Sequence, residues 1–588
     1  MDIIVLCLFF ALPLLVTLLS PSALLKQLYL GIGIYYLLIF VFFIFMEIAS
    51  WPFIEQYSSR PNQQFFQYLS HPKEVLLMLW ADYKILFVST ALFLVYFVKF
   101  GWQAIQFLLH NAKPWSYKKQ LVVLPIAITL LTLGARSGIG QANANPGLAA
   151  FSNNHLLNQL ALNASYSLSY SYYLSRRSAF KSRAWFGNMK TSEIISRIKK
   201  YMDVNEKDFT SKDIPTLHIQ RPIFDREKPL NLVIIIMEGF GSDHIGTLGG
   251  PPLTPNFDKL SKEGVLFTNV HAIGTRTSRG IEALVSGLLP TAKASSIMKM
   301  ELAQGNFFTI ASLLRDYNYQ TSFIYGGESH FDNMSAFFLE NGFQQIIDEN
   351  DFEDPTHSGA WGISDEDTFT KANNEFKQKK GNFLSVILTI SNHPPFDIPE
   401  GKIALYETPT HTPNNATKYA DYALGKFFEQ AKKEDYYNNT VFLITADHPL
   451  LIRADSLVPV NKYKIPGLII APGLSPERID TLGSQIDLLP TALGLLGIET
   501  QHPMIGRNLL HESPSIPNKQ VSIYSHSIAF RTNEKVSIHQ PKSPAKIFII
   551  DDEGNFIETS DNAEFTKDAL AHILFPSVSY FNQFYRHK

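Results

Sequence analysis

The sequence predicts an N-terminal bundle of membrane-spanning α-helices, followed by an α/β sheet domain with a small β-rich C-terminal appendage. Three observations lead to this architecture. Residues 1–135 hold a series of long apolar stretches, the next part of the chain alternates strands with helices, and Lys546–Thr559 has the pattern of a β-hairpin. At 588 residues the chain exceeds one ordinary domain. We divide it into transmembrane helices (1–137), linker helices (138–228), an α/β domain (229–514) and its C-terminal subdomain (515–588).

The membrane prediction rests on four apolar stretches: Ile3–Leu19, Leu24–Met46, Val75–Val98 and Leu121–Leu133. Because a span needs about 20 such residues, the first three qualify and the fourth is marginal. Asp82 and Lys84 interrupt the third stretch, and charges inside lipid are costly. They mark either a functional pocket or a span that starts later, and we favour the later start.

Lysine placement predicts the orientation of the spans. The segment Lys99–Gln120 and the short link that contains Lys26 carry the excess of positive charge. The positive-inside rule places both in the cytoplasm. Everything after Arg136 is then extracytoplasmic, and so is the N-terminus. We therefore expect a multi-pass protein of the inner (cytoplasmic) membrane with its α/β domain in the periplasm.

Charge and cysteine content exclude several classes of function. The formal net charge is −2, so nothing in the electrostatics favours a nucleic-acid partner. The single cysteine, Cys7, lies in an apolar stretch. The chain therefore has no internal disulfide, no thiolate metal site and no cysteine-derived nucleophile in its soluble part.

Residues 138–173 are rich in Asn, Ser, Ala and Tyr, with some apolar residues at helical spacing. This segment lies along the membrane surface or forms a packed connecting helix, and we favour the helix. Beyond Pro229, strands and helices alternate, which predicts a large sheet with helices on both faces. The expected strands are Leu232–Ile236, Val265–Val270, Thr321–Tyr325, Phe383–Thr389, Val441–Thr445 and Gly467–Ala471; the expected helices include Ser278–Leu288, Lys418–Lys432 and Gln485–Leu496.

Acidic and histidine side chains follow two of these strands. Leu232–Ile236 is an unbroken apolar run, typical of a strand buried on both faces, and Glu238 comes directly after it. Val441–Thr445 repeats the pattern and is followed by Asp447 and His448. Since the carboxyl ends of parallel strands form the ligand crevice of such sheets, these side chains predict one metal site with oxygen and nitrogen ligands.

The loop Gly274–Gly280, with the sequence GTRTSRG, lies between a predicted strand and a predicted helix. Backbone N–H groups at a helix N-terminus suit a phosphate or sulfate, and Arg276 and Arg279 add bidentate donors. Thr277 or Thr275 could act as a nucleophile whose hydroxyl is activated by a metal. The alternative is a plain helix cap with solvated arginines.

His393 follows the predicted strand Phe383–Thr389, in the sequence SNHPP. It is thus a third residue delivered to the same sheet edge. A single histidine is more often structural, but beside a metal site it suits proton donation or phosphate binding.

Together these residues resemble a family. The blocks IIIMEGFG, LTPNFDKLSKEGVLFTN, GTRTSRGIEAL, FIYGGESHFDNM, WGISDEDTF, ISNHPPF, TADH and SQIDLLPTAL are similar to those of the lipoteichoic acid synthase and phosphoglycerol transferase family, membrane-anchored members of the alkaline phosphatase and sulfatase superfamily. The resemblance implies that the α/β domain (229–514) is a sulfatase-like catalytic domain. It also implies that one manganese or magnesium ion is held by Glu238, Thr277, Asp447 and His448.

By the same resemblance, Thr277 is the nucleophile and forms a glycerophospho-threonine intermediate, and His393 contacts the phosphate or protonates an alkoxide. The donor is phosphatidylglycerol or a similar phospholipid, and the acceptor is a glycan or a lipid-linked molecule. The family's synthases place a tryptophan and an arginine in the block that here reads SHFDNM. In this chain we expect His330 and Asp332 to bind substrate beside Arg276 and Arg279.

Three alternatives remain at this point. A phosphoethanolamine transferase shares the fold, but its periplasmic domain is commonly rich in cysteine. A phosphodiesterase or sulfuric ester hydrolase also shares it, but a true sulfatase needs Cys or Ser in a C/S-x-P-x-R frame, where this chain has Thr275 and Thr277. A catalytically silent membrane scaffold belongs to a different class, and the presence of all four expected ligands weighs against it.

Overall fold

The fold is that of a computed structural model of the whole chain. The structure describes residues 2–57, 60–61, 63–68, 72–111, 115–136, 155–177, 182–292, 296–300, 303, 306–329, 331–450, 452, 456–511, 516–551, 555–559 and 563–587. These residues form two compact units. The first is Met1–Arg177, and the second comprises Ser178–Ile452 and Leu457–Lys588.

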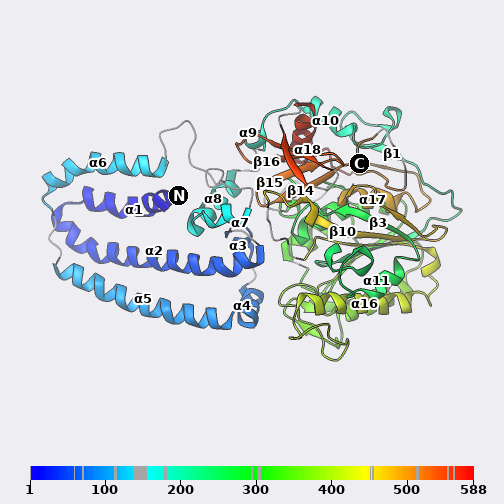
Figure 1. Ribbon diagram of the computed structural model, residues 1–588, viewed down its shortest axis with the longest axis horizontal. Helices are drawn as coiled ribbons and strands as arrows, with labels where there is room; N and C mark the ends of the chain where they lie inside the picture. The colour runs from blue at the N-terminus through cyan, green and yellow to red at the C-terminus, as the bar shows by residue number, and fades with distance from the viewer. Residues whose placement is uncertain are drawn as a thin grey trace. The chain divides into compact units, whose positions relative to one another are not determined.

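The first unit is helical. Its long helices lie side by side in the order α6, α1, α2, α5 (Figure 1). Its helices are α1 (Asp2–Leu19), α2 (Ser22–Tyr57), α3 (Gln63–Tyr68), α4 (Pro72–Asp82), α5 (Lys84–Asn111), α6 (Tyr117–Arg136), α7 (His155–Leu160) and α8 (Ala164–Arg177). Among the described residues, four helical segments are long and apolar enough to cross a membrane: Asp2–Leu19, Gln27–Gln56, Lys84–Asn111 and Tyr117–Arg136. This number of candidate spans equals the number predicted from the sequence.

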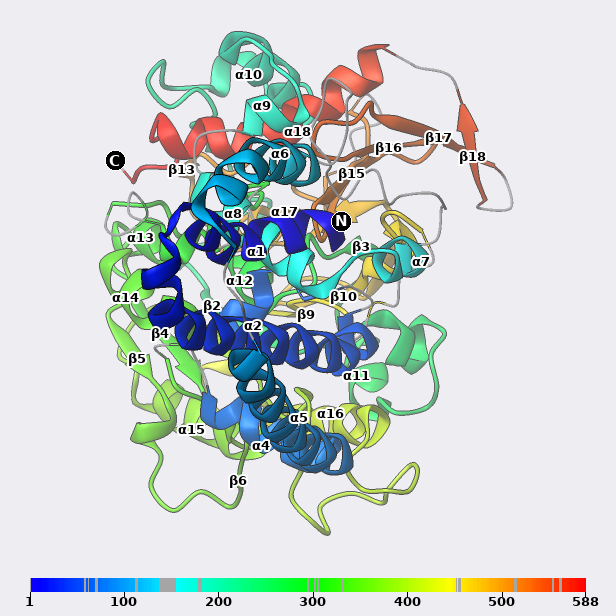
Figure 2. The ribbon, with the colours of Figure 1, turned by 90° about the vertical axis from the view of Figure 1, so that its left-hand side faces the viewer.

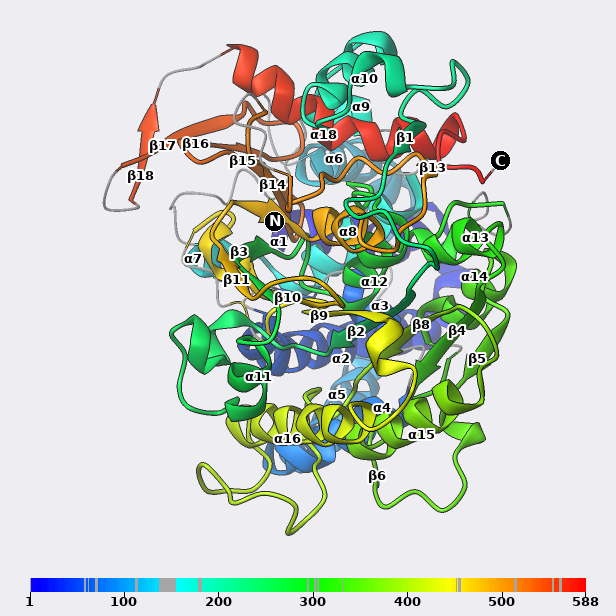
Figure 3. The ribbon, with the colours of Figure 1, turned by 90° about the vertical axis from the view of Figure 1, so that its right-hand side faces the viewer.

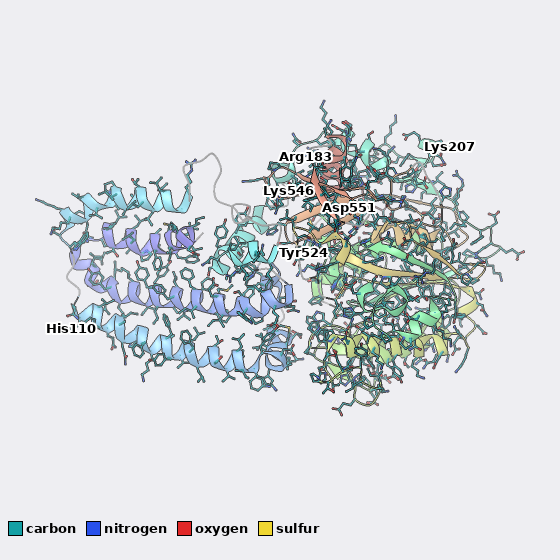
Figure 4. The ribbon with its side chains drawn as sticks, viewed as in Figure 1. His110, Arg183, Lys207, Tyr524, Lys546 and Asp551 are labelled. Carbon is teal, nitrogen blue, oxygen red and sulfur yellow. The ribbon has the colours of Figure 1, made fainter. Side chains whose placement is uncertain are left out.

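The third span is displaced from its predicted position. The predicted stretch Val75–Val98 is broken between α4 and α5, and the candidate span begins at Lys84. Asp82 thus ends the preceding helix, as the later-start alternative requires. The predicted end at Val98 was wrong, because α5 continues through the apolar residues of Trp102–Leu109, and Lys99 lies inside the helix. His110 stands near the far end of α5 (Figure 4).

Helix α8 packs against the membrane helices. Tyr166 joins a buried cluster with Ile4 and Val5 of α1, and Leu168 joins another with Met46 of α2. The carboxylate of Glu47 on α2 accepts a hydrogen bond from Ala164 N at the start of α8 (3.0 Å). Helix α8 contacts α1 and α2, and lies near α1 in the end-on view (Figure 2). The connecting helix favoured from the sequence is thus a packed part of the first unit.

The second unit contains the predicted α/β sheet, which has nine strands in the order β11-β3-β10-β9-β2-β8-β4-β5, with β12 pairing β3 off this path. The strands are β2 (Asn231–Met237), β3 (Val265–His271), β4 (Gln320–Tyr325), β5 (Gln345–Ile347), β8 (Phe383–Leu388), β9 (Thr440–Ala446), β10 (Lys464–Ile470), β11 (Glu477–Ile479) and β12 (Gly483–Ser484). Central β2 is buried along its whole length and runs parallel to both β8 and β9. Strand β10 runs antiparallel to β3 and β9, which the apolar pattern did not indicate.

Helices cover both faces of this sheet, as predicted. Helices α11, α15 and α16 lie on one face, and α12 and α17 lie on the other (Figure 3). The α-helices of this unit are α9 (Ser182–Phe186), α10 (Thr191–Lys199), α11 (Pro255–Leu260), α12 (Thr277–Ser286), α13 (Ile310–Arg315), α14 (Met334–Glu340), α15 (Asp365–Gln378), α16 (Pro413–Ala431), α17 (Gln485–Leu493) and α18 (Ala563–Phe581). Two small two-stranded sheets pair β1 (His218–Gln220) with β13 (Thr500–His502) and β6 (Ser358–Gly359) with β7 (Gly362–Ile363).

The β-rich appendage is a five-stranded antiparallel sheet. Its strands are β14 (Gln520–Tyr524), β15 (Ser527–Arg531), β16 (Lys535–His539), β17 (Lys546–Ile550) and β18 (Phe556–Thr559). Lys546 is the first residue of β17, and Asp551 directly follows its last residue (Figure 4). The hairpin expected at Lys546–Thr559 is β17 paired with β18. The appendage is joined to the large sheet through Ile523 N, which donates to Ile273 O (2.7 Å).

Candidate active site

Three neighbouring parallel strands deliver the candidate site. Because β8, β2 and β9 are adjacent and parallel, their carboxyl ends meet at one edge of the sheet. Glu238 follows β2, and Asp447 with His448 follows β9. The loop after β8 crosses to the same place, because Thr389 Oγ1 accepts a hydrogen bond from Glu238 N (2.9 Å). The juxtaposition expected from the strand ends is present.

Glu238, Asp447 and His448 form the one group of three or more His, Cys, Asp or Glu with metal-ligand spacing in the described part of the chain. Their ligand atoms all lie within 4.8 Å of one another. His448 Nε2 is 3.1 Å from Asp447 Oδ2 and 3.6 Å from Glu238 Oε1. Oxygen and imidazole ligands from two strand ends are a donor set that divalent cations accept.

The electrostatics of the two carboxylates fit a cation. Burial raises the pKa of Glu238 well above its usual value, and the neighbouring Asp447 raises it further. Asp447 Oδ1 accepts hydrogen bonds from Gly239 N (2.9 Å) and His448 N (2.8 Å), whereas its buried Oδ2 has no hydrogen-bond partner. Two adjacent buried carboxylates are costly unless a positive charge lies between them. The residues therefore fit a divalent metal ion.

The tautomer of His448 suits the same role. Its Nδ1 lies 2.9 Å from the carbonyl oxygen of Pro449, which can only accept a hydrogen bond. Nδ1 therefore carries a proton, and in a neutral ring the lone pair is on Nε2, the nitrogen that faces both carboxylates. Pro449, which directly follows the expected metal histidine, supplies the carbonyl that fixes this tautomer.

Thr277 is the first residue of α12, where unpaired backbone N–H groups converge. Its Oγ1 donates a hydrogen bond to Glu238 Oε2 (3.1 Å), which brings the hydroxyl into the metal-ligand group. Gly280 permits this approach, because a Cβ there would lie 2.4 Å from the backbone oxygen of Asp447. Thr275 lies in the loop before the helix.

His393 lies in the loop after β8, where a turn is closed by His393 N donating to Ile390 O (3.0 Å). Its Nδ1 is 2.9 Å from Pro394 O, so its Nε2 carries the lone pair. Burial lowers the pKa of His393 to about 4, so the ring is neutral at pH 7. Asn392 ties this loop to β2, since its amide donates to the carbonyls of Glu238 (3.2 Å) and Gly239 (3.3 Å).

The expected substrate-binding residues have different surroundings. Arg276 is half-buried at the N-cap of α12. Arg279 is buried on the same helix, and burial, followed by the charge of Arg276, lowers its pKa to about 10. Asp332 is buried and has a left-handed backbone with φ of 51°. His330 lies outside the described residues.

Sequence reasoning missed several polar groups that build the site. Thr389 and Asn392 anchor the β8 loop to β2, and Asp365 at the start of α15 accepts hydrogen bonds from Ile390 N (2.8 Å) and Ser391 N (2.9 Å). Asn392 sits next to His393 in the sequence, so its position after a buried strand was a usable signal. Asp365 gave none, because nothing in its local pattern relates it to the β8 loop.

Comparison with known proteins agrees with this fold. A crystal structure of a protein in the alkaline phosphatase superfamily from Vibrio parahaemolyticus is 37% identical, with a TM-score of 0.66; the match covers 69% of this chain and 100% of that one. The chain belongs to the alkaline phosphatase superfamily. Within this superfamily, the Sulfatase family profile matches residues 230–498, which contain every strand of the large sheet.

Curated relatives in this superfamily are more distant. The lipoteichoic acid synthase-like protein YvgJ of Bacillus subtilis is 25% identical, over 54% of this chain and 54% of that protein. Phosphoglycerol transferase I of Xanthomonas campestris is 27% identical, over 50% of this chain and 44% of that protein. The chain thus spans about half the length of the curated relatives it matches. The crystal structure of the lipoteichoic acid synthase LtaP from Listeria monocytogenes, 22% identical over 68% of this chain and 100% of that one, has the same fold with a TM-score of 0.55.

Proposed function

We propose that this superfamily member is a membrane-bound, metal-dependent transferase. It moves a phosphoglycerol group from phosphatidylglycerol to an extracytoplasmic glycan or lipid-linked acceptor through a Thr277-linked intermediate. One observation carries the proposal: the Thr277 hydroxyl, at a helix N-terminus, donates to Glu238 within the Glu238–Asp447–His448 group. Similarity to lipoteichoic acid synthases and phosphoglycerol transferases supports the choice of the transferred group.

Glu238, Thr277, Asp447 and His448 would hold one ion, Mn²⁺ or Mg²⁺. Such an ion lowers the pKa of a hydroxyl and stabilises the charge that develops on a reacting phosphate. The backbone N–H groups at the start of α12 and the guanidinium of Arg276 add donors for the phosphate oxygens. Arg279, His330 and Asp332 complete the proposed substrate-binding set.

The chain's own residues then perform two displacements. Thr277 Oγ1 attacks the phosphorus of the donor, the bond from phosphorus to the diacylglycerol oxygen breaks, and that oxygen leaves with a proton. The acceptor hydroxyl next attacks the same phosphorus and loses its proton. The bond from phosphorus to Thr277 Oγ1 breaks, and Oγ1 takes up a proton to restore the free hydroxyl. His393 Nε2 would exchange the proton in these steps, because Nδ1 is engaged with Pro394 O.

The test is mass spectrometry of products from the purified full-length protein with phosphatidylglycerol labelled in the head group, in the presence of Mn²⁺. We expect labelled diester products and unlabelled diacylglycerol, and neither with the Thr277→Ala variant. Phosphatidylethanolamine serves as the parallel donor. Turnover of phosphatidylethanolamine with none of phosphatidylglycerol would contradict the phosphoglycerol assignment.

A further inference from the structure

Trp361 has no role in the proposed chemistry, yet its side chain contacts His393, which does. It occupies the turn between β6 and β7, and this hairpin rests on Gly326 and Gly327, which follow β4. Ile363 N donates to Gly326 O (2.7 Å). A Cβ on Gly362 would lie 2.3 Å from Gly326 O, and a Cβ on Gly327 would lie 2.7 Å from Trp361 O. Glycines on both sides thus allow a close backbone contact that fixes the position of Trp361.

The indole of Trp361 holds His393 in two ways. The two ring centroids are 3.9 Å apart, with the planes inclined by 45°. The indole Nε1–H donates to Pro394 O (2.7 Å), and the same carbonyl accepts from His393 Nδ1 (2.9 Å). Phe331 also packs against Trp361 in an edge-to-face geometry, with a centroid distance of 5.7 Å.

Asp365, four residues after Trp361, holds the part of the β8 loop that precedes His393. Asp365 Oδ1 accepts from Ile390 N and Ser391 N, and Asp365 N donates to Ser391 Oγ (3.1 Å). Asp365 is fully buried. Residues 361–365 therefore fix the β8 loop before and after His393, and Trp361 alone contacts the imidazole among these anchors.

We propose that Trp361 is a positioning residue for His393: its ring sets the plane of the imidazole, and its hydrogen bond orients the carbonyl that keeps the proton on Nδ1. His393 Nε2 is thereby left as the ring nitrogen available to the substrate. The inference rests on the proposed function, in which His393 Nε2 exchanges a proton. If Trp361 acts only through His393, substitution of Trp361 should not change kcat in a protein that lacks His393.

The test is a double-mutant cycle on the full-length protein with Mn²⁺, using bis(p-nitrophenyl) phosphate as a donor without a glycerol group. Trp361→Leu keeps an apolar side chain without a ring, and should lower kcat roughly 10- to 100-fold, as loss of an orienting partner does. Trp361→Phe keeps a ring but lacks the indole N–H, so its kcat should lie between those of the Leu variant and the wild type. In the His393→Gln background, Trp361→Leu should change kcat less than about twofold.

Trp185→Leu is the matched control, because Trp185 is half-buried in α9 of the same unit. The kcat of Trp185→Leu should equal that of the wild type. The Tm and the bound manganese of Trp361→Leu should equal those of Trp185→Leu. An equal loss with and without His393, equal activity of the Phe and Leu variants, or loss of manganese in Trp361→Leu would overturn the inference. Cleavage of the chromogenic diester without turnover of phosphatidylglycerol would contradict only the proposed function. No turnover of either donor would contradict both the proposed function and the inference about Trp361.

Discussion

At the scale of single residues, Asp447 has the most unbalanced environment in the candidate site. It is fully buried, one carboxylate oxygen accepts two backbone N–H groups, and the other has no hydrogen-bond partner. An unpaired buried carboxylate oxygen costs free energy that a bound cation would offset. The adjacent Glu238, whose pKa is raised by burial and by Asp447, has the same need.

Asp447→Ala and His448→Ala should therefore lose bound metal while the fold survives. Metal content measured by elemental mass spectrometry should fall from about one ion per chain to near zero, with the circular-dichroism spectrum retained. Asp435→Ala, which removes an exposed carboxylate of the same unit, is the control. Metal content in the Asp447 and His448 variants equal to that of the control would refute the ligand assignment.

At the scale of elements, Glu282 joins α12 to the segment that follows it. The carboxylate accepts hydrogen bonds from the hydroxyl of Ser296 and from the backbone N–H groups of Ile297 and Met298. Burial nevertheless raises the pKa of Glu282 from 4.5 to about 7. The folded state then holds a proton that the unfolded state releases between these two values. This contribution to stability is complete below pH 4.5 and is lost as the pH rises through about 7.

Glu282→Gln keeps the acceptor oxygen and removes the titration. The wild-type Tm should fall more steeply than the Tm of the variant as the pH rises from about 4.5 to about 7. Thermal denaturation of both proteins across this window checks the expectation. Parallel Tm curves for the two proteins would show that Glu282 does not titrate in the window.

Also at this scale, the sequence predicted those elements that have a distinctive pattern of apolar and polar residues. The apolar runs of β2, β8 and β9 identified three buried strands, and the polar residues after them indicated Glu238, Asp447 and His448. The antiparallel insertion of β10 was not predictable, because an apolar run has the same pattern in either direction. The contacts of Trp361 and Asp365 with the β8 loop depend on tertiary packing between loops, for which local spacing carries no signal.

At the scale of the whole molecule, the charge pattern predicts the orientation in the membrane. Lys118 and Lys119 lie at the start of α6, and Lys113 precedes it in the sequence, so the link between α5 and α6 is basic even though Lys99 lies within α5. A reporter that works only in the cytoplasm should be active when fused near Ser116 and inactive when fused after Lys588. The reverse pattern would place the second unit in the cytoplasm, away from an extracytoplasmic acceptor.

The central claim for the whole molecule is that Thr277 carries the transferred group. Thr275 lies two residues earlier, in the loop before α12, and is the matched control. Removal of a nucleophile should lower turnover by several orders of magnitude, whereas removal of a neighbouring hydroxyl should cost far less. Thr277→Ala should therefore be inactive, and Thr275→Ala should keep measurable activity.

The most direct measurement is to trap the covalent adduct from labelled phosphatidylglycerol without an acceptor, and to map it by peptide mass spectrometry. The account predicts a glycerophospho group on Thr277, and none in the Thr277→Ala protein. A head-group phosphate found on Thr275 or Ser278, or an active Thr277→Ala protein, would contradict it.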